Sequence, residues 1–282
     1  MKNILLQEKT RPKKTIRLRR SLLVLVLICL ALSMSACELT PALRRTAERS
    51  INSLISGIPL SAEDLAGSMA LDYSPIPFVR LRLEITPQSL TKEAVDIDFA
   101  QFPKLRVSTK FHFTGLYRLY ANDRQIVSDK KIDLIGEGWI NLGFEDNRFF
   151  IDDFPSIALK LADQAAQCPD IDTIVREPKS VAPGETYRVS TTISSNVPGH
   201  LAYLVFSNNK AVTPDRTVLK TSIAKPQYHY EANMRTDTGL AADNYYGNIM
   251  AVQFITANPK NLLDLSAYDA LFTTAITLIK VK

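Results

Sequence analysis

Apolar and polar residues alternate along the segment that follows Phe78, and this period of two constrains the fold more than any other feature of the sequence. Val79, Leu81, Leu83 and Ile85 are separated by charged residues. Such alternation is typical of a β-strand that buries one face and exposes the other. The pattern recurs at residues 95–99, 105–113 and 132–142, with a turn expected at 86–91. Residues 144–150 cross a second expected turn, at Glu145-Asp146-Asn147. The sequence therefore predicts an antiparallel meander.

Helical spacing replaces the alternation at three places. Residues 41–58 carry an apolar stripe at intervals of three and four, and Pro41 suits a first helical turn. Ser61, followed three residues later by Asp64, has the pattern of a capping box and starts a second helix. Residues 155–167 also show helical spacing. Because one face of the meander must be covered, we expect the two N-terminal helices to cover it, which gives an α+β fold for residues 37–169.

A polar, proline-containing segment, residues 170–183, is expected to be a linker. Residues 184–282 contain short alternating stretches separated by turn signals such as Pro198-Gly199. About seven strands in roughly 100 residues predict a β-sandwich. The opening Pro-Gly-Glu-Thr-Tyr of residues 183–187 and the pair Asp243-x-Tyr245 resemble those of an immunoglobulin-like module. The Cys–Trp–Cys mark of true immunoglobulin domains is absent, since the single tryptophan, Trp139, lies in the preceding domain.

The N-terminal segment has the layout of an export signal. Eight basic residues and one acid occupy its first part, an apolar run covers residues 22–32, and small residues precede Cys37. The apolar run is short for a bilayer span, which needs about 20 apolar residues.

The residues before Cys37, Met34-Ser35-Ala36, resemble the lipobox of bacterial lipoproteins. The resemblance implies that residues 1–36 are a signal peptide cleaved after Ala36, and that Cys37 carries a diacylglyceryl group and an acyl chain such as palmitate. Leucine is commoner in the family where this chain has Met34. In that family an aspartate after the cysteine retains proteins in the inner membrane, so Glu38 indicates the outer membrane. The alternative is an uncleaved signal anchor with a cytoplasmic basic tail.

Basic residues exceed acidic residues in the whole chain, 34 to 29, for a net charge of +5. Removing the eight basic residues and one acid of residues 1–36 leaves 26 basic and 28 acidic residues, a net charge of −2. The basicity therefore belongs to targeting, and it argues against nucleic-acid binding. The first helix carries Arg44, Arg45 and Arg49 on its polar face. These arginines either contact anionic lipid head groups beside the anchor or form an ordinary solvated face.

Catalytic motifs are absent from the sequence. It contains no Gly-x-Ser-x-Gly nucleophile elbow, no phosphate-binding Gly-Lys-Ser/Thr loop and no His-Glu-x-x-His pair. The histidines, His112, His200 and His229, are far apart in the sequence, and we expect them at the surface. We predict no catalytic residue, no metal site and no cofactor.

Cysteine and paired acids are the remaining candidates for chemistry. Cys168 is the only cysteine left once the signal is removed and Cys37 is lipidated, so no intramolecular disulfide can form. Its thiol is either buried or reactive. Three acidic pairs could serve glycoside hydrolysis or calcium binding, although domain-edge acids are usually solvated. They are Asp152-Asp153, Asp170-x-Asp172 and Asp237 with Asp243.

We therefore predict a non-enzymatic lipoprotein of the bacterial cell envelope, anchored through Cys37 and facing the periplasm. It would act as a binding or scaffold module for an envelope protein or lipid, with the sandwich outermost. The alternative is a lipid or hydrophobic-ligand carrier that uses residues 60–167, because helices followed by a long meander resemble periplasmic lipid-binding lipoprotein domains. An enzyme is the third hypothesis.

Overall fold

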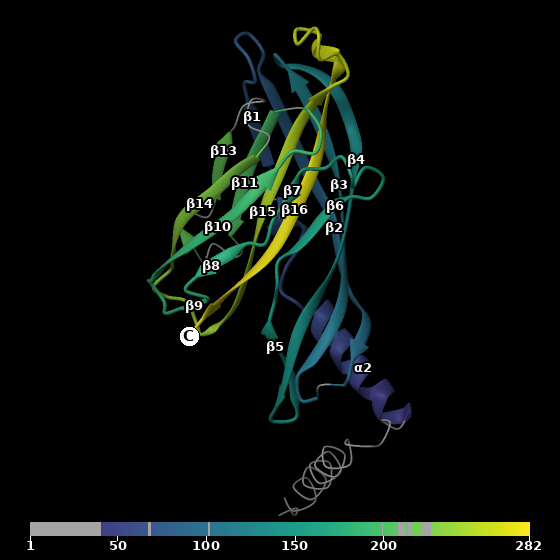
Figure 1. The fold of residues 1–282 in the computed structure, drawn as a ribbon, viewed down its shortest axis with the longest axis vertical. Helices are drawn as coiled ribbons and strands as arrows, with labels where there is room; N and C mark the ends of the chain where they lie inside the picture. The colour runs from purple at the N-terminus through teal and green to yellow at the C-terminus, as the bar shows by residue number, and fades with distance from the viewer. Residues whose placement is uncertain are drawn as a thin grey trace, which may run out of the picture.

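The described part of the chain is mostly β, with 60% of its residues in strands and 11% in helices, so the predicted α+β class is wrong. The computed structural model describes residues 41–66, 69–100, 102–198, 200–207, 212–213, 216–220 and 227–282. Within these ranges the α-helices are α2 (Pro41–Ser56) and α3 (Ala62–Ala66). They are too short to cover the sheet, which curls instead and closes much of its core with its own strands (Figure 1).

One large curled sheet takes strands from both halves of the chain. Its order is β1-β2-β3-β4-β6-β16-β15-β11-β13, with β5 paired to β4 and β9 paired to β16. The first half supplies β1 (Met69–Tyr73), β2 (Leu81–Asp98), β3 (Leu105–Ala121), β4 (Arg124–Glu145), β5 (Arg148–Asp153) and β6 (Ile157–Leu161). The second half supplies β9 (Ser180–Val181), β11 (His200–Ser207), β13 (Arg216–Lys220), β15 (Asp243–Thr256) and β16 (Tyr268–Val281), the last preceded by a 3-10 turn at Leu265–Ala267.

A smaller sheet packs against one face of β15 and β16. Its strands are β7 (Asp170–Ile171), β8 (Val175–Glu177), β10 (Thr186–Ser194), β12 (Val212–Thr213) and β14 (Gln227–Thr236). Val189 and Ile193 of β10 meet Ile249 and Ala275 of the large sheet in a second hydrophobic core. Strands β7, β8 and β9 all lie within residues 170–183, the expected linker.

Strands β15 and β16 are buried on both faces because they lie between the two cores. Met250 and Phe272 belong to the first core, whereas Ile249 and Ala275 belong to the second. This explains why each strand has apolar residues at consecutive positions, as in residues 249–252 and 270–272, instead of a strict alternation. The large sheet thus passes without a break through both parts that the sequence pattern separates at residues 170–183.

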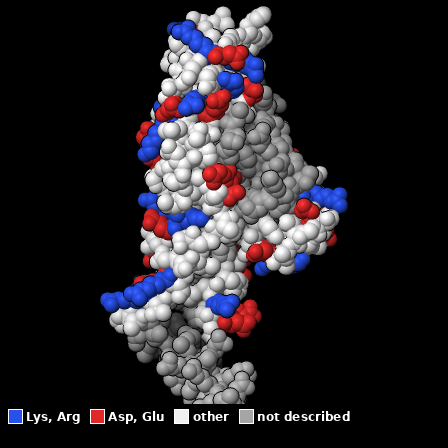
Figure 2. Space-filling model, turned by 180° about the vertical axis from the view of Figure 1, so that it is seen from behind, with Lys and Arg blue, Asp and Glu red and all other residues white. Residues whose placement is uncertain are grey.

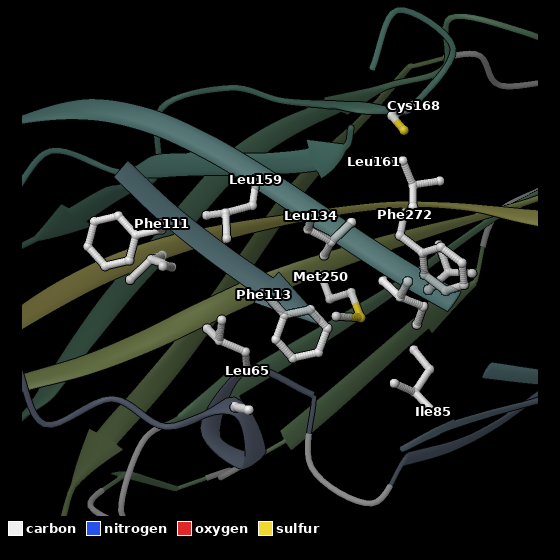
Figure 3. Close-up of a cluster of buried hydrophobic side chains, with 14 of the residues drawn as sticks. Leu65, Ile85, Phe111, Phe113, Leu134, Leu159, Leu161, Cys168, Met250 and Phe272 are labelled. Atoms are coloured by element: carbon white, nitrogen blue, oxygen red, sulfur yellow. The ribbon is translucent and has the colours of Figure 1, made fainter. Parts of the chain in front are cut away.

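The first core fills the concave side of the curled sheet (Figure 3). Phe111 and Phe113 of β3, Leu159 of β6 and Met250 of β15 all belong to this cluster. Leu65 of α3 projects into the same core and is fully buried. The short helix therefore helps to close the core, but it does not form a layer.

The predicted turn at 86–91 and the predicted helix at 155–167 are both wrong. Strand β2 runs through the first segment and accommodates Pro87 with a β-bulge between Pro87 and Ser89, where a missing N–H is tolerated. The second segment contains β6. Ile157 and Leu161 are four positions apart, a spacing that places two residues on one face of a helix but also on one face of a strand. Gly136 of β4 allows β6 to cross closely, since a Cβ there would lie 2.4 Å from the Ala158 carbonyl oxygen.

The N-terminal helices follow the sequence pattern at their ends. Ile51, Ile55 and Ile58 of the predicted stripe are buried. The Ser61 and Asp64 pair forms a reciprocal capping box, with Ser61 N donating to Asp64 Oδ2 at 2.7 Å and Asp64 N donating to Ser61 Oγ at 3.2 Å. Both local predictions are confirmed.

Candidate functional site

The most exposed large apolar side chain of the described residues is Phe78, in the loop between β1 and β2. Its side chain is 91% exposed. The flanking residues are anchored in the protein, because Tyr73 and Val79 are buried and Ile76 packs against the first core. Tyr73 also stacks on Phe254, with ring centroids 5.6 Å apart. The loop is therefore fixed at both ends while the Phe78 ring stands in solvent.

The backbone of Phe78 has an unfavourable conformation for an aromatic residue. Val79 N donates a hydrogen bond to Ile76 O at 3.2 Å, which closes a turn with Pro77 and Phe78 at its centre. Phe78 has a φ of 70°. Proline at the second position and a positive φ at the third are features of a type II turn, whose third position favours glycine. Side chains with a Cβ pay about 1–2 kcal/mol for this conformation.

Asn122, in the tight turn between β3 and β4, holds the strained loop in place. Its Nδ2 donates to Phe78 O at 2.8 Å, and its Oδ1 accepts from Arg80 N at 2.8 Å. Its backbone N donates to Arg80 O, also at 2.8 Å. Three hydrogen bonds from one residue on both sides of Val79 thus fix the backbone that displays the Phe78 ring.

A hollow of about 470 Å3 adjoins the ring. It is lined by residues 74–80 and Asn122, so the loop itself forms most of its wall. Its rim is charged, since Arg80 pairs with Asp72 at 3.2 Å and both side chains are about half exposed. An aromatic side chain beside a hollow with a polar rim is the arrangement found at the centre of many protein interfaces. We call residues 74–80 with Asn122 the Phe78 loop.

The Phe78 loop lies at the end of the molecule opposite to helix α2 (Figure 1). The distal end also carries the loop of residues 257–267, in which Leu263 is 65% exposed. Eighteen residues of β2 connect the Phe78 loop to the region where α2 packs. At about 3.3 Å per residue this strand spans roughly 60 Å.

The sequence-predicted membrane-contacting residues lie at the other end. Arg44, Arg45 and Arg49 are all exposed on α2. Arg44 pairs with Glu48 at 2.9 Å, and its guanidinium lies 5.9 Å from the centre of the Phe99 ring. Helix α2 and the turn between β4 and β5 lie at the same end of the molecule (Figure 1). Cys37 and the cleavage position Ala36 lie outside the described residues.

The remaining candidates are dispersed. His112 pairs with Asp133 at 2.6 Å on the outer face of the meander, and His229 is exposed on β14. Within the described ranges no group of three His, Cys, Asp or Glu side chains could hold a metal ion. On the face shown in Figure 2, acidic and basic side chains are interspersed toward the distal end.

Cys168 is completely buried, so the first of the two interpretations of its thiol is confirmed. Burial raises the pKa of the Cys168 thiol, although backbone hydrogen bonds from Leu161 and Phe272 oppose this shift. A protonated and inaccessible thiol is a poor nucleophile.

Sequence patterns missed the Phe78 loop because they assign Phe78 to the start of a strand. A signal was nevertheless present. The buried residues of this segment, Val79, Leu81 and Leu83, have odd numbers. Phe78 has an even number, so the alternation places its side chain on the exposed face. An aromatic residue out of phase with its strand, preceded by Pro77, marks a displayed side chain.

Comparison with known proteins assigns the chain to no family. No family model, no curated protein and no solved structure matches the chain. Neither helix in the described part of the chain has the length and apolar character needed to cross a bilayer.

Proposed function

We propose that the protein is a lipid-anchored binding module of the bacterial envelope that holds the Phe78 loop away from the membrane to bind a partner protein. Cys37 would anchor the chain, and Arg44, Arg45 and Arg49 would lie against anionic head groups. The long strands β2, β3 and β4 would act as a rigid spacer. The partner would offer an apolar groove for the Phe78 ring, with polar contacts to Arg80 and Asp72 around it.

The observation that carries this proposal is the strained and clamped display of Phe78. A left-handed backbone conformation at a bulky residue persists only where the surrounding structure enforces it, and such residues concentrate at functional positions. Here three hydrogen bonds with Asn122 enforce this conformation. The Phe78 ring itself is exposed, so the conformation does not serve to bury it in the protein's own core. A preformed aromatic anchor loses little entropy on binding, which favours affinity.

Site-specific photocrosslinking in cells tests the proposal. A photoreactive phenylalanine analogue would replace Phe78, and matched proteins would carry it at Val95 or at Arg49. Val95 is exposed on the surface of β2, away from the Phe78 loop. We expect a discrete protein adduct from position 78, lipid adducts from position 49 and no protein adduct from position 95. The same adducts from positions 78 and 95, or lipid adducts from position 78, would contradict the assignment.

The carrier alternative needs a cavity on the concave side of the sheet, and the described side chains there give it no support. Phe111 packs edge-on against Phe154, and Phe154 packs edge-on against Tyr246, with ring centroids 6.2 Å and 5.5 Å apart. Tyr117 meets Phe272 in the same way at 5.0 Å. Copurifying lipid in native mass spectrometry of the Cys37→Ser protein would nevertheless favour the carrier over the binding module.

A further inference from the structure

The interior between the smaller sheet and strand β16 contains hydrogen-bonding groups without partners. Arg176 Nε, Tyr230 Oη and Thr277 Oγ1 are each enclosed and make no hydrogen bond to the described residues. Tyr187 Oη reaches only the sulfur of Met234, at 3.9 Å. Thioether sulfur is a weak acceptor, and buried polar groups without partners are rare in native proteins. These groups therefore require an explanation.

Strand register brings these groups to one face of the smaller sheet. Arg176 of β8 lies opposite Val189 of β10, and Val189 is buried in the second core. The neighbours of Arg176, Val175 and Glu177, are exposed, so the arginine side chain is the one of the three directed inward. Tyr187 lies two residues from Val189 on the same face.

Tyr230 and Thr277 complete the cluster from two further strands. Tyr230 of β14 is buried in the second core opposite Thr191 of β10. Thr277 lies between Ala275 and Ile279 on β16, and both of these neighbours belong to the second core. The cluster is thus shared by both sheets of the sandwich.

The cluster is rich in donors and carries one positive charge. Guanidinium groups only donate hydrogen bonds, and each hydroxyl can donate one. Among the described residues, Arg176 has no carboxylate within salt-bridge distance. The exposed Arg188 on the outer face of the same sheet pairs with both Glu177 and Glu231. Burial lowers the pKa of Arg176 to about 10, while attraction from Tyr187 and Asp153 opposes this shift. The side chain as a whole is partly buried, with its Nε enclosed.

We propose that Arg176, Tyr187 and Tyr230 bind one small monovalent anion, chloride or a carboxylate, at the edge of the sandwich. An anion supplies the acceptor that Arg176 Nε and Tyr230 Oη lack and that Tyr187 Oη finds only in the Met234 sulfur, and its single negative charge pairs with the guanidinium. Among the described strands β8 pairs with β10 alone, so it lies at the edge of the smaller sheet, and the partly buried side chain of Arg176 lies near solvent there. This inference is independent of the role proposed for the Phe78 loop.

Crystals of the soluble Cys37→Ser protein, which is unchanged at the proposed site, test the proposal directly when they are soaked in sodium bromide or in sodium formate. We expect an anomalous bromide peak within hydrogen-bond distance of Arg176 Nε, replaced by planar formate density if the site prefers a carboxylate. An ordered water in both soaks, without an anomalous peak, would overturn the proposal. Because this measurement needs no substitution at Arg176, it does not depend on a variant that folds.

Thermal unfolding supplies a second test in solution. Replacing a non-binding anion by chloride at constant ionic strength should raise the unfolding midpoint by about 2–4 °C. Arg176→Met should abolish this chloride-specific rise. The control Arg148→Met removes an exposed arginine and should retain it. An equal chloride response in Arg176→Met and in the unmodified protein would refute the assignment.

Discussion

The clamped conformation of Phe78 has a measurable cost in stability. Phe78→Gly relieves a left-handed conformation worth about 1–2 kcal/mol and adds a glycine entropy cost of about 0.5–1 kcal/mol. We expect a net stabilisation of about 0.5–1 kcal/mol in denaturant unfolding. The same change at exposed Val95, inside β2, should destabilise the protein, since glycine weakens a strand.

Function and stability should separate at this residue. If the Phe78 ring binds a partner, Phe78→Gly will lose the partner adduct while the protein becomes more stable. A Phe78→Gly protein that is less stable than the unmodified one would show that the ring stabilises the fold. The backbone conformation of Phe78 would then not be a strain retained for function.

Asn122 provides a graded test of the clamp. Asn122→Gly keeps the left-handed turn, because Asn122 itself has a φ of 48°, but it removes both side-chain hydrogen bonds to the loop. At this exposed position we expect a loss of about 1 kcal/mol or less. Partner binding should weaken more than stability does, and amide exchange at Val79 and Arg80 should accelerate. Unchanged exchange at these two amides would mean that Asn122 does not hold the loop.

Residue patterns predicted the local features that depend on neighbours in sequence. The Ser61–Asp64 cap and the Asp146-Asn147 turn follow from side chains a few positions apart, and both residues of that turn have positive φ. The donor cluster around Arg176 could not be predicted. Its members come from β8, β10, β14 and β16, and only the strand register brings them together.

At the scale of elements, helix α2 is tied to the sheet through one lysine. Lys92 Nζ of β2 donates to Ile58 O at 2.5 Å and to Leu60 O at 2.8 Å, just beyond the end of the helix. Asn52 Oδ1 of α2 accepts from Ala94 N of β2 at 3.3 Å. Lys92 therefore supplies a charged donor to carbonyls of the segment that joins α2 to α3, and helix α2 covers part of the edge of β2.

Replacing this lysine should loosen the helix without unfolding the sheet. We expect Lys92→Met to cost about 1–3 kcal/mol because it leaves two carbonyls without their charged donor. Hydrogen exchange should accelerate at the amides of Ile51 to Ser56 and remain slow in β3. The matched control is Lys104→Met, an exposed lysine outside the strands. Equal exchange in both variants would show that the apolar stripe alone holds the helix.

Element types were predictable where a stretch had only one consistent period. The alternation of β3 is confirmed by its burial pattern along the whole strand. Prediction failed at β6, whose five residues satisfy both periods, and at β2, where Pro87 suggested a turn although a bulge absorbs it. The fold class failed for a further reason, because the pairing of β6 with β16 joins residues more than 100 positions apart.

At the scale of the whole molecule, buried tyrosines link stability to alkaline pH. Burial raises the pKa of Tyr187 and of Tyr230 from 10.0 to about 12, with Arg176 opposing the shift of Tyr187 and Tyr187 adding to that of Tyr230. Burial also raises the pKa of Tyr117, reinforced by Asp269, and that of Tyr246. The unfolded chain therefore releases phenol protons at a lower pH than the folded protein does.

Stability should consequently be lost as the pH rises above about 10. The contribution of raised pKa values is complete below the unfolded pKa, and Tyr187 and Tyr230 together should lose about 2 kcal/mol between about pH 10 and 11. Denaturant unfolding across this range, with tyrosinate absorbance as the second probe, measures the slope. Tyr187→Phe should make the slope shallower. A slope unchanged by that substitution would show that Tyr187 ionises equally in both states.

We propose that the whole molecule stands on the membrane, with the Phe78 loop at the end that lies furthest from the bilayer. Energy transfer from a fluorophore at position 78 to acceptors in the lipid head groups, in vesicles carrying the lipidated protein, tests this arrangement directly. A fluorophore at position 45 in a second sample gives the membrane-proximal reference. We expect efficient transfer from position 45 and a fluorophore about 50 Å further from the bilayer at position 78. Equal transfer from the two positions would contradict it.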